Sequence, residues 1–147
     1  MPGVIIIMDA DKYRIFVVDD EADTADLIAS SLSALTDHTV LSFDSPQNAI
    51  DSYMKQPSDL VVSDLNMPNI DGFEMIQKLK DRNLNTDFIL VTGEKNIKTV
   101  VHGRWLGVSY LFFKPVNIDE LTQAVGTMYK RACYWEDRLK EVKRKQG

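Results

Sequence analysis

The sequence predicts an α/β fold in which a parallel sheet of five strands carries helices on both of its faces. Five short runs of consecutive apolar residues alternate along the chain with segments whose apolar residues recur every three or four positions. Consecutive apolar positions are typical of strands buried on both faces, and such strands belong to parallel sheets. The 147 residues are enough for one domain with a sizeable core.

The apolar runs set the limits of the expected strands. These strands are Arg14–Val18, Thr39–Phe43, Leu60–Ser63, Phe88–Val91 and Tyr110–Phe113. A helix is expected after each strand, and the last helix begins near Asn117. No internal repeat, low-complexity segment or interior linker interrupts this alternation.

Capping residues and proline place the ends of several helices. Asp23 or Thr24 can cap the first helix. Ser45 and Pro46 begin the second, because a hydroxyl caps a helix and proline fits its first position. Gly107 closes the fourth. The residues expected to face the core from the first three helices are Ala25, Ile28, Leu32, Leu35, Ala49, Ile50, Tyr53, Phe73, Ile76 and Leu79.

Composition argues against several classes of protein. The formal net charge of -5 disfavours a general nucleic-acid binder. Cys133 is the only cysteine, so no internal disulfide can form, which fits a cytoplasmic protein. With only two histidines besides, a zinc site is not expected. The apolar run Val4–Met8 is far shorter than the ~20 residues of a membrane span, so residues 1–12 are expected to form an N-terminal tail.

Polar and charged residues stand at the ends of four of the five strands. Asp19 and Asp20 follow the first, Asp64 the third, Thr92 the fourth and Lys114 the fifth. Because the carboxyl ends of parallel strands share one edge, these side chains are expected to meet there. Three close carboxylates repel one another unless a cation joins them, and hard oxygen ligands suit Mg²⁺. A lysine and a threonine hydroxyl beside them could hold a phosphoryl group on a carboxylate.

From about Tyr13 to Lys130 the chain resembles the receiver domain of response regulators in two-component signalling. The residues that carry the resemblance, in matching order and spacing, are Val17-Val18-Asp19-Asp20-Glu21, Asp64-Leu65-Asn66-Met67-Pro68 with Asp71-Gly72, Val91-Thr92-Gly93 and Phe113-Lys114-Pro115. The resemblance implies a doubly wound, flavodoxin-like sheet in the strand order 2-1-3-4-5. It also implies a phosphorylation-dependent signalling switch, which is not an enzyme beyond its own phosphorylation and dephosphorylation.

The resemblance assigns the acidic residues to a phosphoryl acceptor and a magnesium site. Asp64 would accept a phosphoryl group from a sensor histidine kinase, a histidine phosphotransfer protein or a small acyl phosphate. Asp20 and Asp64 would bind Mg²⁺ directly, together with the backbone carbonyl of Asn66. Asp19 would support the metal through water.

Further residues are assigned to phosphoryl binding and to the lifetime of the phosphoryl group. Thr92 and Lys114 would contact the phosphoryl oxygens, and a cis peptide bond before Pro115 would aim the lysine. Asn66 and Glu94 stand at the two positions that tune dephosphorylation in this family. This pair resembles that of fast-cycling chemotaxis receivers, so the phosphoryl state is expected to be short-lived.

One position departs from the family pattern. Many receivers carry Tyr or Phe three residues before the lysine that ends the fifth strand, and that ring moves inward together with the threonine on activation. Here the position is Leu111, and Tyr110 faces the other side of the strand. Signal output could instead pass through the fourth helix, which carries Trp105, or through the last helix.

The last helix is expected to pack on the sheet from Ile118 to about Met128 and to extend beyond the receiver after Lys130. Its apolar or small residues, which alternate steps of three and four, are Ile118, Leu121, Val125, Met128, Ala132, Trp135, Leu139 and Val142. The sequence therefore divides into a receiver over residues 13–130 and a helical extension over 131–147, which is expected to form a coiled coil or a linker to an output domain. A homodimer through residues 118–142 is one expected partner arrangement.

Other functions remain open on the sequence. The receiver could be a fragment of a hybrid kinase or of a regulator with an enzymatic output. A hydrolase of the haloacid-dehalogenase type would need a second carboxylate two residues after its nucleophile, where this chain has Asn66. A nucleotide binder of flavodoxin type would need a loop rich in Gly, Ser or Thr after the first strand, where this chain has Asp19-Asp20-Glu21.

Overall fold

The computed structural model describes residues 12–83 and 85–146 and contains the predicted five-stranded parallel sheet. Its strands lie in the order β2-β1-β3-β4-β5. They are β1 (Arg14–Val18), β2 (Thr39–Phe43), β3 (Leu60–Asp64), β4 (Asp87–Thr92) and β5 (Tyr110–Phe113). The strand order reverses between β1 and β3, and ligand sites of open α/β sheets lie at such a switch point.

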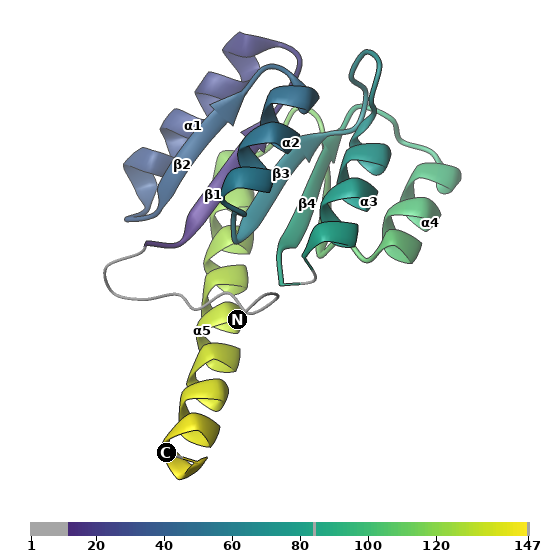
Figure 1. Ribbon diagram of the computed structural model, residues 1–147. Helices are drawn as coiled ribbons and strands as arrows, with labels where there is room; N and C mark the ends of the chain where they lie inside the picture. The colour runs from purple at the N-terminus through teal and green to yellow at the C-terminus, as the bar shows by residue number, and fades with distance from the viewer. Residues whose placement is uncertain (1–11, 84, 147) are drawn as a thin grey trace.

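Helices cover both faces of the sheet, as Figure 1 shows. The five helices are α1 (Ala22–Leu35), α2 (Pro46–Lys55), α3 (Gly72–Arg82), α4 (Ile97–Leu106) and α5 (Ile118–Gln146). Side chains of α1 and α5 form one apolar cluster against the sheet, and side chains of α2 and α3 form a second cluster on the other face. Two buried layers hold the strands rigid, so the strand ends present their side chains from a fixed frame.

The start of α2 and the end of α4 follow the sequence rules closely. The Ser45 hydroxyl accepts a hydrogen bond from the backbone N–H of Asn48, and Pro46 occupies the first helical position. Gly107 ends α4 with a φ of 85°, a left-handed conformation that glycine adopts without a steric penalty. Both predictions of helix ends are confirmed.

The expected cap and inner face of α1 need correction. The helix begins at Ala22 with Glu21 at the cap position and no capping side chain, so Asp23 and Thr24 lie inside the first turn and cap nothing. Ala25, Ile28 and Leu32 are buried as predicted. Leu35 is 57% exposed, because it is the last residue of the helix.

α5 has 29 residues and projects beyond the sheet, as the yellow end of the ribbon in Figure 1 shows. Its first part packs on the core, where Leu121, Val125 and Met128 are at most 4% exposed. In the projecting part, Trp135 and Leu139 are 59% and 41% exposed. The apolar stripe is therefore continuous along the helix, but the sheet covers only its first half.

Two sequence predictions concern the ends of the chain and the membrane. The N-terminal tail that was expected over residues 1–12 lies outside the described residues except for Lys12. Within residues 12–83 and 85–146, no helix combines the length and the apolar character that a bilayer crossing requires.

Candidate functional site

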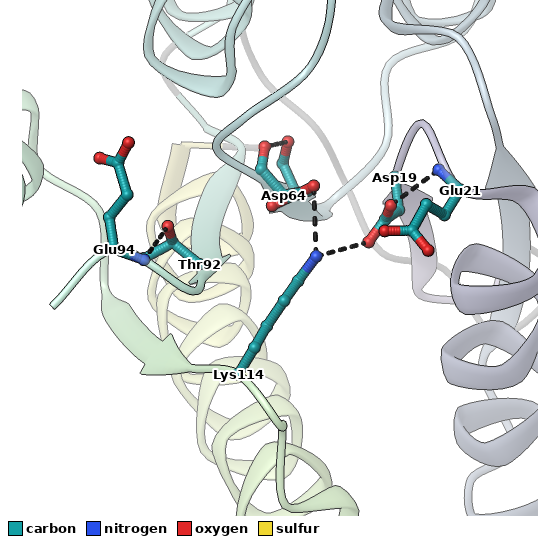
Figure 2. A network of polar contacts seen from close by, with 7 residues as sticks. Asp19, Glu21, Asp64, Thr92, Glu94 and Lys114 are labelled. Carbon is teal, nitrogen blue, oxygen red and sulfur yellow. Dashed lines mark hydrogen bonds and ion pairs between the residues drawn. The ribbon is translucent and has the colours of Figure 1, made fainter.

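Lys114 joins two carboxylates that come from different strands. Its Nζ lies 3.2 Å from Oδ2 of Asp19 and 3.3 Å from Oδ2 of Asp64, and Figure 2 shows the amino group between the two carboxylates. The residue follows β5, and its backbone N–H donates to the Thr92 carbonyl at the end of β4. The Lys114–Pro115 peptide bond is cis, as the resemblance implied.

Asp64 ends the central strand and is almost fully buried, with 6% of its surface exposed. Burial is the main reason why the pKa of its carboxyl is raised above the ordinary value, and the nearby Asp19 raises it further. The ammonium of Lys114 opposes both effects and lowers it. Conversely, burial lowers the pKa of Lys114, but the two carboxylates outweigh burial and raise it overall. The lysine therefore helps to keep this carboxylate ionised.

Asp19, Asp20 and Asp64 form the predicted acidic cluster. One carboxylate oxygen of each residue lies within 4.8 Å of the others, Asp19 and Asp64 are buried, and Asp20 is exposed. The loop after β1 fixes Asp19, because its Oδ1 accepts a hydrogen bond of 2.9 Å from the backbone N–H of Glu21. Oxygen ligands from a few carboxylates, with room for water on the exposed side, fit the way proteins bind Mg²⁺. The donor set of the cluster thus fits that ion.

The loop after Asp64 returns to the end of β3 at the point where α3 begins. Gly72 begins α3 and donates its backbone N–H to the Leu65 carbonyl at 2.8 Å. A Cβ atom at Gly72 would lie 2.5 Å from the Asp64 carbonyl oxygen, closer than real Cβ contacts allow. Asp71 caps α3 by accepting from the backbone N–H of Glu74. The Asp71-Gly72 pair of the sequence motif thus has a structural reason, because only glycine fits at its second position.

Thr92 ends β4 beside Asp64 and is fully buried. Its Oγ1 accepts a hydrogen bond of 3.0 Å from the backbone N–H of Glu94. The Glu94 carboxylate in turn accepts a hydrogen bond of 3.0 Å from the hydroxyl of Thr99, in the first turn of α4. Sequence reasoning did not find Thr99, because nothing in the spacing of the Thr92-Gly93-Glu94 motif points to a partner in the next helix.

The departure at Leu111 is visible in the packing of β5. Leu111 packs on the cluster under α2 and α3, and Tyr110 packs on the opposite cluster under α1 and α5. The ring of Tyr110 stacks on Phe112 at a centroid distance of 5.9 Å, on that same side of the sheet. Tyr110 therefore cannot stand in for the aromatic residue that many receivers carry three positions before the lysine.

The comparison with protein families assigns the chain to a known family. The family model of the response regulator receiver domain matches residues 15–126, which is most of the chain. The chain belongs to the response regulator receiver domain family. Receiver domains are signalling domains, so the strand-end cluster lies in a signalling protein. Its residues are Asp19, Asp20, Asp64, Thr92 and Lys114.

Curated relatives place receivers like this one in different kinds of protein. The chain is 28% identical to a probable chemotaxis protein CheY of Rhizobium etli over 82% of its length and 95% of that protein. It is 30% identical to the transcriptional regulatory protein FixJ of Bradyrhizobium diazoefficiens over 82% of its length but 58% of the relative. It matches the sensor protein EvgS of Escherichia coli K12 at 28% identity over 10% of that protein. Receivers of this kind thus occur alone and as parts of longer chains.

Solved receiver structures share the fold. The receiver domain of a Luxo repressor protein from Vibrio parahaemolyticus superposes with a TM-score of 0.79 at 22% identity, covering 87% of this chain and 97% of that one. A receiver domain protein from Clostridium thermocellum gives a TM-score of 0.77 at 22% identity, covering 83% and 98%. The strand order and the flanking helices are therefore those of receiver domains, as predicted.

Proposed function

We propose that this receiver, over residues 13–130, is a magnesium-dependent phosphorylation switch of the cytoplasm in which Asp64 accepts the phosphoryl group. The observation that carries the proposal is the position of the Lys114 ammonium between the carboxylates of Asp64 and Asp19, with Asp20 beside them. Burying a carboxylate beside a lysine and two further carboxylates costs desolvation free energy. Such groups of perturbed charges occur most often at functional sites.

The proposed reaction uses a carboxylate oxygen of Asp64 as the nucleophile. This oxygen forms a bond to the phosphorus of the donor, and the bond from phosphorus to the donor's nitrogen or oxygen breaks. Lys114 supports the step twice, since it favours the ionised form of Asp64 and can donate to the phosphoryl oxygens. The Thr92 hydroxyl already accepts from Glu94 and still has its own proton to donate to a phosphoryl oxygen.

Asp20, Asp64 and the backbone carbonyl of Asn66 are the proposed direct magnesium ligands, and Asp19 supports the ion through water. When bound, Mg²⁺ supplies positive charge that offsets the negative charge of the incoming phosphoryl group. The exposed position of Asp20 leaves this side of the cluster open to water, which Mg²⁺ retains in most protein sites.

The proposed donor is a sensor histidine kinase or a histidine phosphotransfer protein. This proposal is supported by the relatives, which include the regulator FixJ and the sensor proteins EvgS and RcsC of Escherichia coli.

We further propose that the extension of α5 pairs with a second copy as a parallel coiled coil. The seam is narrower than the 118–142 expected from the sequence, because Leu121, Val125 and Met128 are already buried on the sheet. Ala132 still packs on the core cluster, whereas Trp135, Leu139 and Val142 continue the heptad spacing beyond it and are 41–59% exposed. Lone helices of this length are marginal in water, so a partner for this stripe would stabilise the extension.

Beryllofluoride, which mimics a phosphoryl group, tests the acceptor site without a kinase. Fluorine NMR of the protein with beryllofluoride and Mg²⁺ should show a bound signal that chelation of the metal removes. Asp64→Asn should abolish the signal, and Asp71→Asn, which changes a carboxylate of the same loop outside the cluster, should retain it. A bound signal that survives in Asp64→Asn would refute the assignment.

A further inference from the structure

The Glu94 side chain is held by α4 and not by the acidic cluster. Its Oε2 accepts a hydrogen bond from the hydroxyl of Thr99, and its backbone N–H donates to Thr92. Figure 2 shows the Glu94 side chain extending away from Lys114 and not pointing at the carboxylate of Asp64. The residue proposed to tune dephosphorylation is therefore turned from the site in this state.

Two electrostatic effects favour that position of the carboxylate. The N-terminus of a helix carries a partial positive charge that attracts a carboxylate. The first turn of α4 contains no acidic residue of its own that could interact with this charge. The three carboxylates of Asp19, Asp20 and Asp64 outnumber the one ammonium of Lys114, so without a metal ion their net negative charge repels a fourth carboxylate. Thr99 adds a directional hydrogen bond from a buried hydroxyl, since the residue is 5% exposed.

We propose that Thr99 is a positioning residue that restrains Glu94 at α4 and thereby slows the hydrolysis of the phosphoryl group on Asp64. This inference rests on the proposed acceptor role of Asp64. Bonding to Thr99 and approach to the phosphoryl group compete for the same Glu94 carboxylate. Loss of the Thr99 hydroxyl shifts this competition toward the phosphoryl group, where bound Mg²⁺ together with Lys114 reduces the repulsion.

The hydrolysis in question releases inorganic phosphate. A water oxygen forms a bond to phosphorus while the bond from phosphorus to the Asp64 oxygen breaks, and the carboxylate leaves with the electron pair. One water proton must be lost in this step. A Glu94 carboxylate near the phosphoryl group can accept a hydrogen bond from the water, orient it, and take up this proton before it passes to the solvent.

The test measures how fast the phosphorylated protein decays. The full chain is phosphorylated with a small acyl phosphate and Mg²⁺, the donor is removed, and intact mass follows the loss of the phosphoryl group. Thr99→Val, which keeps the shape of the side chain, should speed the decay by roughly two- to tenfold, the range that one lost hydrogen bond allows. Thr99→Ser retains the hydroxyl and should decay like the parent. Glu94→Ala should decay more slowly than the parent.

The double variant Glu94→Ala with Thr99→Val separates positioning from a general structural effect. Its decay should equal that of Glu94→Ala alone, because no carboxylate is left to release. Equal decay of Thr99→Val and the parent would overturn the proposal, as would an acceleration that persists without Glu94 or a Thr99→Ser variant that behaves like Thr99→Val.

Failure of the acceptor assignment gives a different result. A parent chain that forms no adduct contradicts the proposed function and, with it, any effect of Thr99 on decay. A parent that forms the adduct while Thr99→Val leaves its decay unchanged contradicts the positioning role alone. Thermal unfolding of the parent, Thr99→Val, Glu94→Ala and the double variant measures the coupling between Glu94 and Thr99 without phosphorylation, and an absence of coupling would also overturn the restraint.

Discussion

The ammonium of Lys114 lies 3.3 Å from the carboxylate of Asp64, although β4 separates the strands that carry them. The lysine follows β5 and reaches across the end of β4 to β3, and its second contact, at 3.2 Å, is with Asp19 after β1. One cation therefore ties together the ends of three strands. Because burial already raises the pKa of the Asp64 carboxyl, removal of this cation should destabilise the folded protein.

Lys114→Met should destabilise the metal-free protein at neutral pH. The substitution leaves the buried carboxylates of Asp19 and Asp64 facing each other without a counter-charge. The free energy of unfolding should therefore fall by about 1–2 kcal/mol. This loss is smaller than for a fully buried ion pair, because the lysine side chain is 29% exposed. Mg²⁺ should raise the Tm of this variant more than that of the parent, because a second cation can replace the first. Thermal melts with and without Mg²⁺ test this, with the exposed Lys98→Met as the control. Equal Mg²⁺ responses in Lys114→Met and the parent would argue against a shared charge balance.

Asp64→Asn should stabilise the metal-free protein at neutral pH. The pKa of Asp64 is raised in the fold, so between the ordinary aspartate pKa and the raised value the folded chain binds more protons than the unfolded chain. Stability therefore falls as the pH rises through this window and stays lowered above it. Asn carries no charge to desolvate, so its Tm should exceed that of the parent by roughly 2–5 °C at neutral pH, with a gain that shrinks as the pH falls towards the ordinary value. The exposed Asp44→Asn should change Tm little at any pH, and a pH-independent gain for Asp64→Asn would contradict the explanation.

Gly72→Ala should strain the loop that follows Asp64. The new Cβ would lie 2.5 Å from the Asp64 carbonyl oxygen and 3.0 Å from the Cα of Leu65, and neither backbone atom can move without shifting β3. A destabilisation of about 1–3 kcal/mol is expected in denaturant unfolding. Gly93→Ala is the matched control, because no atom lies within 4 Å of its added Cβ. Similar losses in the two variants would mean that the close approach at Gly72 is not what matters.

Leu139→Lys should weaken the proposed coiled coil without unfolding the receiver. The residue lies in the projecting part of α5, 41% exposed, so its replacement leaves the sheet intact. A lysine on the seam puts two like charges at the interface, and the mass in analytical ultracentrifugation should fall from dimer to monomer. Tyr134→Ser, a change to an exposed residue off the seam, should leave the mass as in the parent. A parent chain that is monomeric at all concentrations tested would contradict the pairing itself.

The sequence predicted the strands and the strand-end cluster because both follow from local patterns. Consecutive apolar residues mark β1, β3 and β4, and the parallel arrangement then brings Asp19, Asp64 and Lys114 to one edge. Local patterns did not predict burial where it depends on a tertiary contact or on the position of a helix end. Leu35 kept the periodicity of α1, yet it lies at the end of that helix and is exposed.

The site also contains contacts that no spacing could reveal. Thr99 lies five residues after Glu94, and the hydrogen bond between them depends on how the loop after β4 enters α4. The heptad spacing of α5, in contrast, predicts that its first part packs on the sheet, and the buried positions of Leu121 and Val125 confirm this. Periodicity gives the face of a helix, but it does not say which neighbour covers that face.

The most direct test of the central claim is the site of phosphorylation. The protein is incubated with a small acyl phosphate, with Mg²⁺ or with a chelator, and intact mass and peptide mapping locate the added group. One phosphoryl group should appear on Asp64, only when Mg²⁺ is present, and Asp64→Asn should remain unmodified. No magnesium-dependent adduct on the parent, or an adduct on another residue while Asp64 stays free, would contradict the account.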